Sequence, residues 1–284
     1  MRLARAEQPG GAWSSDLSVQ ELAALVAVGL EPAGLVLGSS VYNLSGQLGP
    51  LMWGQGAGGW WRSYPCPHGW YHEGARTGYN VEHVPYERGL TEARDLALAR
   101  MQAEAAELGA HGVAGMRVNL SRMEGTWSAI ELTAVGTALR RAGRPPSERP
   151  FTSHLTGQQL GKLLRGGWVP TAMVMGVGVV EMAPGCGIEL RMSSWANAEL
   201  PQLSEAVQAT REIAVQHLQS EAAGSGGDGV VGVSVDFHVR ELGGEAKLCE
   251  LLAMGTAVRR FSDVPLPEPP LVVMPLADRP GRPS

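Results

Sequence analysis

Residues 15–44 read SDLSVQELAALVAVGLEPAGLVLGSSVYNL, and residues 153–182 repeat them without a gap as SHLTGQQLGKLLRGGWVPTAMVMGVGVVEM. The likeness resumes where MQAEAAELGAHGVAGMRV, from residue 101, is matched by LQSEAAGSGGDGVVGVSV, from residue 218, and where ELTAVGTALRR is matched by ELLAMGTAVRR. A unit that occurs twice indicates two related domains packed together. We divide the chain into an irregular lead (1–14), domain 1 (15–142), a linker (143–152), domain 2 (153–261) and a Pro-rich tail (262–284).

Bulk composition favours a protein that assembles with itself. Only 18% of the 284 residues are charged while 44% are hydrophobic, so the charged surface is thin for two small domains, which favours further burial. The net charge of −5 argues against a nucleic-acid partner. No apolar run is long enough to span a bilayer, and Cys66, Cys186 and Cys249 do not form a disulfide framework. We expect a cytoplasmic homo-oligomer without membrane insertion.

Local patterns predict the same elements in both copies. Ser18 with Glu21, and Thr156 with Gln159, form capping boxes that start a short leading helix. The patterns then predict a strand (35–42 and 172–181), a long helix (91–108 and about 206–223) and two closing strands (113–120 with 128–140, and 230–239 with 247–259). The fold class is therefore α+β, with two tandem β-α-β-β domains. Each three-stranded antiparallel sheet packs with one long helix.

The last strand of each copy is apolar on both faces. A strand of this kind is covered on both sides, yet one long helix covers only one face of a sheet. The other face must meet the sister domain, another subunit or the leading helix, and we interpret it as an oligomer-forming surface. Glu131 and Glu250 lie inside these strands, so each needs a partner. We expect a salt bridge to an arginine such as Arg117 or Arg240, with a collar of carboxylates around a cation as the alternative.

One motif resembles a known family. The run A-R-x-x-A-x-x-x-M-x-x-x-A-x-x-L-G-A-x-G-V-x-G spans Ala93 to Gly115, and a strand ending G-T-A-[LV]-R-R follows it in both copies. This pattern resembles the YbjQ-like family of heavy-metal-binding domains. The resemblance implies a small β-α-β-β domain of the dodecin-like type, which assembles into rings of five. It brings no ligand motif that maps onto residues of this chain. For this tandem we expect a closed ring, with five chains favoured.

An insertion in domain 1, at about 45–89, is the least generic segment. It holds half of the tryptophans, and we predict partner binding or aromatic packing by Trp53, Trp60, Trp61 and Trp70. It also holds thiol and imidazole groups that suit a soft divalent metal such as Zn, Cu or Ni. The candidate metal ligands are Cys66, His68, His72 and His83. Their C-x-H-x₃-H spacing is not that of a zinc finger, so aromatic packing or partner binding is the favoured interpretation.

The sequence contains no G-x-S-x-G motif, P-loop or Rossmann fingerprint. We therefore expect a non-catalytic, ring-forming homo-oligomeric scaffold or partner-binding protein, which displays the Trp-rich loop to an unknown protein. The alternative is a heavy-metal-binding or sequestering protein that uses the loop Cys and His residues. An enzyme of unrecognised type ranks third.

Overall fold

The computed structural model describes residues 13–44, 79–122, 129–183, 197, 199–241 and 247–263. For the hairpin of β2 (Ser63–Cys66) and β3 (Gly69–His72) it describes the backbone alone. Domain 1 contains α2 (Val19–Val26), β1 (Leu30–Asn43), β4 (Tyr79–Glu82), α5 (Val84–Glu107), β5 (Gly112–Arg122) and β6 (Ala129–Arg141). The linker forms β7 (Phe151–Thr152), and domain 2 contains α6 (Gly157–Arg165), β8 (Trp168–Ala183), α8 (Pro201–Gly224), β9 (Gly229–Glu241) and β10 (Lys247–Arg260).

Each domain is built on an antiparallel sheet that gains a fourth strand. The strand orders are β1-β6-β5-β7 and β4-β8-β10-β9, so the predicted three-stranded sheets are extended by β7 and β4. β7 pairs in parallel with β5, whereas β4 pairs antiparallel with β8 from Tyr79↔Ala183 to Glu82↔Val180. The strand that precedes α5 therefore belongs to the sheet of domain 2. The predicted mixed α+β class is confirmed.

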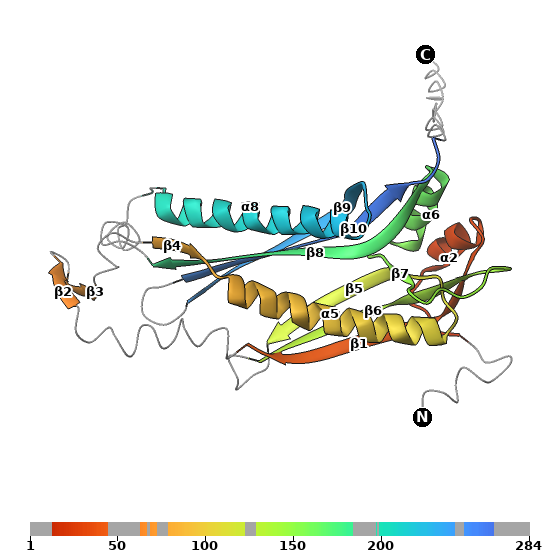
Figure 1. Ribbon diagram of the computed structural model, residues 1–284, viewed down its shortest axis with the longest axis horizontal. Coiled ribbons are helices and arrows are strands. Elements are labelled where there is room, and N and C mark those ends of the chain that lie inside the picture. Colours follow the sequence, from red (N-terminus) through yellow and green to blue (C-terminus); the bar gives the residue numbers. More distant parts are fainter. Residues whose placement is uncertain are drawn as a thin grey trace, which may run out of the picture.

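The structure is a stack of layers with α5 in the middle (Figure 1). α8 lies on one face of the domain 2 sheet, and α5 lies between the other face of that sheet and the sheet of domain 1. Glycines in the first strand of each domain allow the helix to approach closely. A Cβ atom on Gly38 would collide with the backbone of Ala97, and one on Gly176 would collide with the backbone of Ala214.

Both leading helices begin as predicted, with the side-chain and backbone hydrogen bonds of a capping box present at Ser18 and Thr156. The first strands begin earlier than expected, at Leu30 and Trp168. A glycine with positive φ (Gly29, 76°; Gly167, 80°) turns the chain directly from helix into strand.

The long helices also begin earlier than predicted. They start at Val84 and Pro201 rather than at residues 91 and 206, with a proline in the first turn of each. Residues 79–89, which we assigned to the insertion, therefore form β4 and the start of α5. None of the helices in the described residues is long and apolar enough to span a membrane.

The two-sided last strand of domain 2 is covered by its own helix and by the sister domain. Cys249 and Leu251 pack among residues of α8, whereas Leu252 packs in the cluster that includes α5. The counterpart strand, β6, is covered on its second face only at one end, where Leu139 packs with the leading helices. At the other end Glu131 is exposed.

Candidate functional site at the joint between the domains

A buried carboxylate binds the two domains together. Glu250, on β10, is 0% exposed, and Arg122 at the end of β5 donates hydrogen bonds of 2.8 and 3.1 Å to its two oxygens. Arg240 lies 3.5 Å from the same carboxylate and also donates a 2.7 Å bond to the hydroxyl of Tyr86. Burial is the main cause that raises the pKa of Tyr86. The predicted pairing of Glu250 with Arg240 is confirmed, and Arg122 adds a second cation from domain 1.

The corresponding prediction for domain 1 is wrong. Glu131 is exposed, and Arg117 forms its ion pair with Asp16 near the leading helix. A cation held by a collar that includes Glu250 also has no support, because two guanidinium groups already face that carboxylate.

The open edge of β8 is the second feature of the joint. Beyond Glu82, where β4 stops pairing, side chains form the hydrogen bonds with the backbone groups along this edge. Met175 N donates to Glu221 (2.9 Å), and Val179 N donates to Glu87 Oε1 (2.7 Å). His217 Nδ1 lies 2.7 Å from the carbonyl oxygen of Val177. The strand edge therefore fixes side chains from both long helices.

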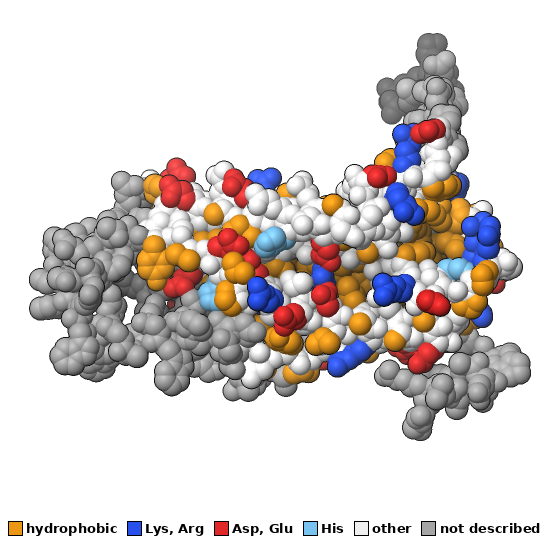
Figure 2. Space-filling view, viewed as in Figure 1, with side chains coloured by type: hydrophobic (Ala, Val, Ile, Leu, Met, Phe, Trp, Pro, Cys, Tyr) orange, Lys and Arg blue, Asp and Glu red, His pale blue; other side chains and the backbone are white. Residues whose placement is uncertain are grey.

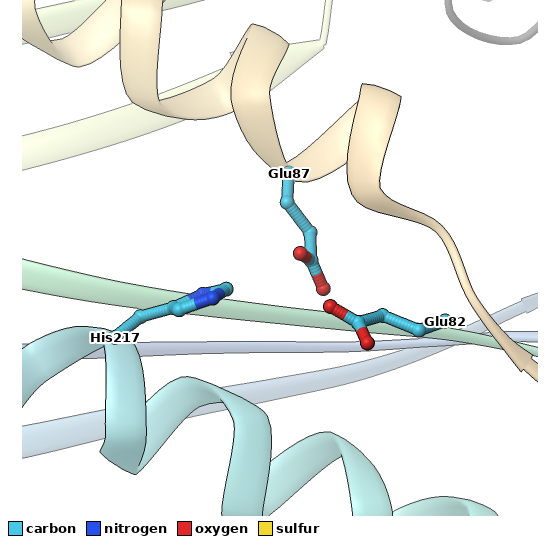
Figure 3. Close-up of side chains that lie close together, drawn as sticks. All are labelled: Glu82, Glu87 and His217. Atoms are coloured by element: carbon cyan, nitrogen blue, oxygen red, sulfur yellow. The ribbon is translucent and has the colours of Figure 1, made fainter.

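Three of the side chains along this edge converge (Figure 3). Glu82 comes from the end of β4, Glu87 from the first turn of α5 and His217 from α8, and one oxygen or nitrogen of each lies within 4.8 Å of the others. Glu87 is 4% exposed, whereas Glu82 and His217 are exposed. The cluster borders an open groove of about 500 Å³ between α5 and α8, with Met175 and Val177 among its lining residues. Figure 2 shows acidic, basic and histidine side chains interspersed on this face.

The electrostatics of the cluster are unusual. Burial raises the pKa of Glu87 to about 7; the Val179 N–H and the nearby His217 oppose this rise, and the nearby Glu82 carboxyl adds to it. Within the described residues neither glutamate forms an ion pair with lysine or arginine, because Arg94 in the same groove is held by Asp95 and Glu221. Two neighbouring carboxyl groups without a counter-ion either share a proton or attract a cation.

His217 completes the set of possible ligand atoms. A carbonyl oxygen only accepts hydrogen bonds, so the 2.7 Å contact requires Nδ1 to carry the proton. When the ring is neutral, the other nitrogen, Nε2, then has a free lone pair that is able to bind a metal ion.

Of the predicted metal ligands, only the side chain of His83 is described. It is buried as the N-cap of α5, where Nδ1 accepts a 3.1 Å hydrogen bond from the backbone N–H of Tyr86. Burial lowers the pKa of His83. Its role is therefore to start the helix, and Nδ1 is not free for a metal.

The other predicted site residues are not tested. Cys66, His72 and Trp70 lie on β2 and β3, whose side chains are outside the described part of the chain. His68, Trp53, Trp60 and Trp61 lie outside the described residues altogether.

Sequence reasoning missed Glu82, Glu87 and His217. The first two flank His83 in the string EHVPYE, but nothing in the chain pattern connects them to a single histidine more than a hundred positions away. The pairing of β4 with β8 and the placement of α5 and α8 on either side of the β8 edge bring these residues together.

Replacement of Glu250 by glutamine should weaken the joint. The substitution leaves Arg122 and Arg240 without a counter-charge, and we expect the free energy of unfolding to fall by about 2–3 kcal/mol. This is less than for fully buried pairs, because the arginine side chains are 31% and 25% exposed. Urea denaturation measures the loss. The matched Glu131→Gln variant should change stability by less than about 0.5 kcal/mol, and equal losses in both variants would contradict this assignment.

Glu87 should make the stability of the metal-free protein depend on pH. Its folded pKa of about 7 lies above the usual 4.5, so the folded state keeps a proton that the unfolded state releases. Stability is therefore full below about pH 4.5 and is lost as pH rises towards 7, by up to about 3 kcal/mol. In chelator, Glu87→Gln should remove this loss between pH 5 and 8, as measured by denaturant unfolding. The exposed control Glu107→Gln should keep the wild-type dependence; an unchanged profile in Glu87→Gln would refute the prediction.

Comparison with known proteins confirms the resemblance. The YbjQ family, described as "Putative heavy-metal-binding", matches residues 74–142 and 167–260. An encapsulin nanocompartment protein of Mycobacterium tuberculosis is 34% identical over 264 residues, covering 91% of this chain and 89% of that protein. A UPF0145 protein of Thermus thermophilus is 46% identical over 68 residues, covering 24% of this chain and 57% of that protein. With two matching segments and more than half of its length covered, the chain belongs to the YbjQ family of domains.

Proposed function

We propose that this chain is a non-catalytic scaffold protein that forms a closed ring by repeating, between chains, the contact that joins its own two domains. The observation that carries this proposal is a difference in exposure between equivalent apolar residues of β8 and β1. On β8, Met173, Met175 and Val179 are 3%, 3% and 0% exposed beneath domain 1. Their counterparts on β1 are Leu35, Leu37 and Val41, which are 41%, 39% and 63% exposed. An apolar row that domain 1 covers in one copy is thus open in the other.

An ion pair supports the same arrangement. Arg94 on α5 binds Glu221 on α8 at 2.7 Å, and Glu221 also accepts the backbone N–H of Met175. Glu104 occupies the position of Glu221 in the other copy, and it accepts the backbone N–H of Leu37 at 2.9 Å. Arg211 occupies the position of Arg94, is exposed, and forms no ion pair within the described residues. An α8 helix laid on the sheet of the next chain would bring Arg211 to Glu104.

The leading helices follow the same head-to-tail pattern. Gly157 and Gly161 of α6 pack closely against Glu21 and Ala24 of α2. The positions of α2 that correspond to these glycines are Val19, which is 83% exposed, and Ala23, which is also exposed. The contact between α2 and α6 thus joins two different surfaces, because the face of α2 that corresponds to the packed face of α6 stays exposed. Head-to-tail contacts produce rings when the rotation closes, and the family resemblance favours five chains.

The partner that we propose for the ring comes from the comparison with known proteins. A relative that matches 91% of this chain is called an encapsulin nanocompartment protein, which supports an encapsulin shell as the partner of the ring. The Trp-rich segment remains our candidate for the contact surface. The absence of recognisable catalytic motifs supports a binding role over catalysis.

A second candidate function, heavy-metal binding, is supported by the description of the family. The loop ligands Cys66, His68 and His72 remain a prediction for that function. His83 also remains a prediction, with its Nδ1 engaged as the cap of α5.

Charge reversal tests the ring. We expect a single oligomer for the wild type, and a smaller species for both Arg211→Glu and Glu104→Arg, because each places like charges across the proposed contact. The double variant should recover the oligomer at least in part. Native mass spectrometry measures the stoichiometry, and circular dichroism verifies the fold. Arg144→Glu, in the exposed linker, is the matched control. A monomeric wild type, or single variants that keep the wild-type mass, would overturn the proposal.

Association with the shell is tested separately. We expect the chain, co-expressed with an encapsulin shell protein, to co-sediment with the assembled shells. Replacement of Trp53, Trp60, Trp61 and Trp70 by alanine should reduce the bound amount several-fold while leaving the ring intact. Recovery of the chain only in the supernatant would reject the shell as partner without affecting the ring.

A further inference from the structure

We propose that Glu82, Glu87 and His217 form a binding site for one divalent cation of the zinc type, at the joint between the two domains of each chain. This inference does not depend on the ring. It also uses different residues from the Cys and His side chains of the loop.

The ligand set suits such an ion. Two carboxylate oxygens and one imidazole nitrogen lie within 4.8 Å of one another, and three protein ligands of these types are common at zinc sites that keep a further position open. Because Glu82 and His217 are exposed and the site borders the groove between α5 and α8, an ion has a direct path from solvent. The mixed oxygen and nitrogen ligands favour Zn²⁺ or a neighbouring transition ion over Ca²⁺.

Two of the ligands are already oriented by the backbone of β8. The carbonyl of Val177 holds His217 through Nδ1, and the N–H of Val179 holds Glu87 through Oε1. A histidine that donates one ring N–H to a carbonyl while the other nitrogen stays free has the outer-shell arrangement of most metal-binding histidines. This contact is independent of the carboxylates, and it fixes the position of the imidazole ring beside them.

The charge balance also favours a cation. The groove is also lined by Arg94, which is paired with Asp95 and Glu221, and by Arg88 and Glu92, which have opposite charges. Within the described residues the buried carboxyl of Glu87 forms no ion pair with a lysine or arginine, and a bound divalent ion would supply the opposite charge.

Two of the three ligands are replaced at the equivalent positions of the other copy, so we expect a single site in each chain. The counterparts of Glu82, Glu87 and His217 are Glu199, Ser204 and Arg100. Arg100 donates to the carbonyl of Ser39 as His217 donates to that of Val177, but a guanidinium does not bind a metal ion. We expect one cation per chain, whatever the size of the ring.

Zinc titration of the full-length, metal-stripped chain tests the site. Calorimetry with Zn²⁺ at pH 7.5 should give one site per chain, and Glu87→Gln or His217→Ala should weaken binding at least 10-fold. Two control variants should bind as the wild type does. His238→Ala removes an exposed histidine beside Asp236, and the triple replacement of Cys66, His68 and His72 by alanine removes the loop ligands. The absence of a stoichiometric site, or binding that only the triple variant abolishes, would overturn the proposal.

A second measurement separates loss of binding from loss of folding. Glutamine at position 87 still accepts the N–H of Val179, so Glu87→Gln should stay folded and keep the oligomeric mass of the wild type. Zn²⁺ should raise the melting temperature of the wild type but not of this variant. An equal rise in both would show that zinc binds elsewhere. A change in oligomeric mass would instead concern the proposed ring.

Discussion

The arrangement of the joint depends on the edge of β8, whose backbone N–H and C=O groups need partners. β4 pairs with this edge only as far as Glu82, and the strand then continues beneath two helices. Buried backbone groups are costly when unpaired, and here Glu221, Glu87 and His217 supply the missing partners. Because Glu87 comes from domain 1 and the other two from α8, satisfying one strand edge also fixes how the domains meet.

The same requirement is only partly met in domain 1. The edge of β1 receives Glu104 at Leu37 and Arg100 at Ser39, which repeat the roles of Glu221 and His217. The counterpart of Glu87 would have to come from the long helix of another domain, because Ser204, at the equivalent position of α8, belongs to domain 2. Val41, at the position of Val179, is therefore 63% exposed. The edge of β8 thus has a partner that the equivalent edge of β1 lacks. This difference is the physical basis for expecting a second chain.

Features that depend on neighbouring residues could be predicted from the sequence, and features that depend on domain packing could not. The capping boxes at Ser18 and Thr156 were predictable because all their atoms lie within one turn. The Glu250–Arg240 pair was predictable because both residues lie on adjacent strands of one sheet. The pairing of β4 with the sheet of domain 2 is short and non-local. The cluster of Glu82, Glu87 and His217 depends both on that pairing and on how α5 and α8 lie along the edge of β8.

Duplication within one chain allows the two kinds of joint to differ. In a ring of identical single domains every joint is the same, whereas a tandem chain has one internal joint and one between chains. In the proposed ring, the joint between chains would carry Arg100, whose charge is permanent, at the position of His217. The internal joint instead places an imidazole beside a carboxyl whose pKa burial raises to about 7. A joint between chains would thus be built with a fixed charge, whereas the internal joint, where covalent linkage already holds the domains together, contains a carboxyl that titrates near neutral pH.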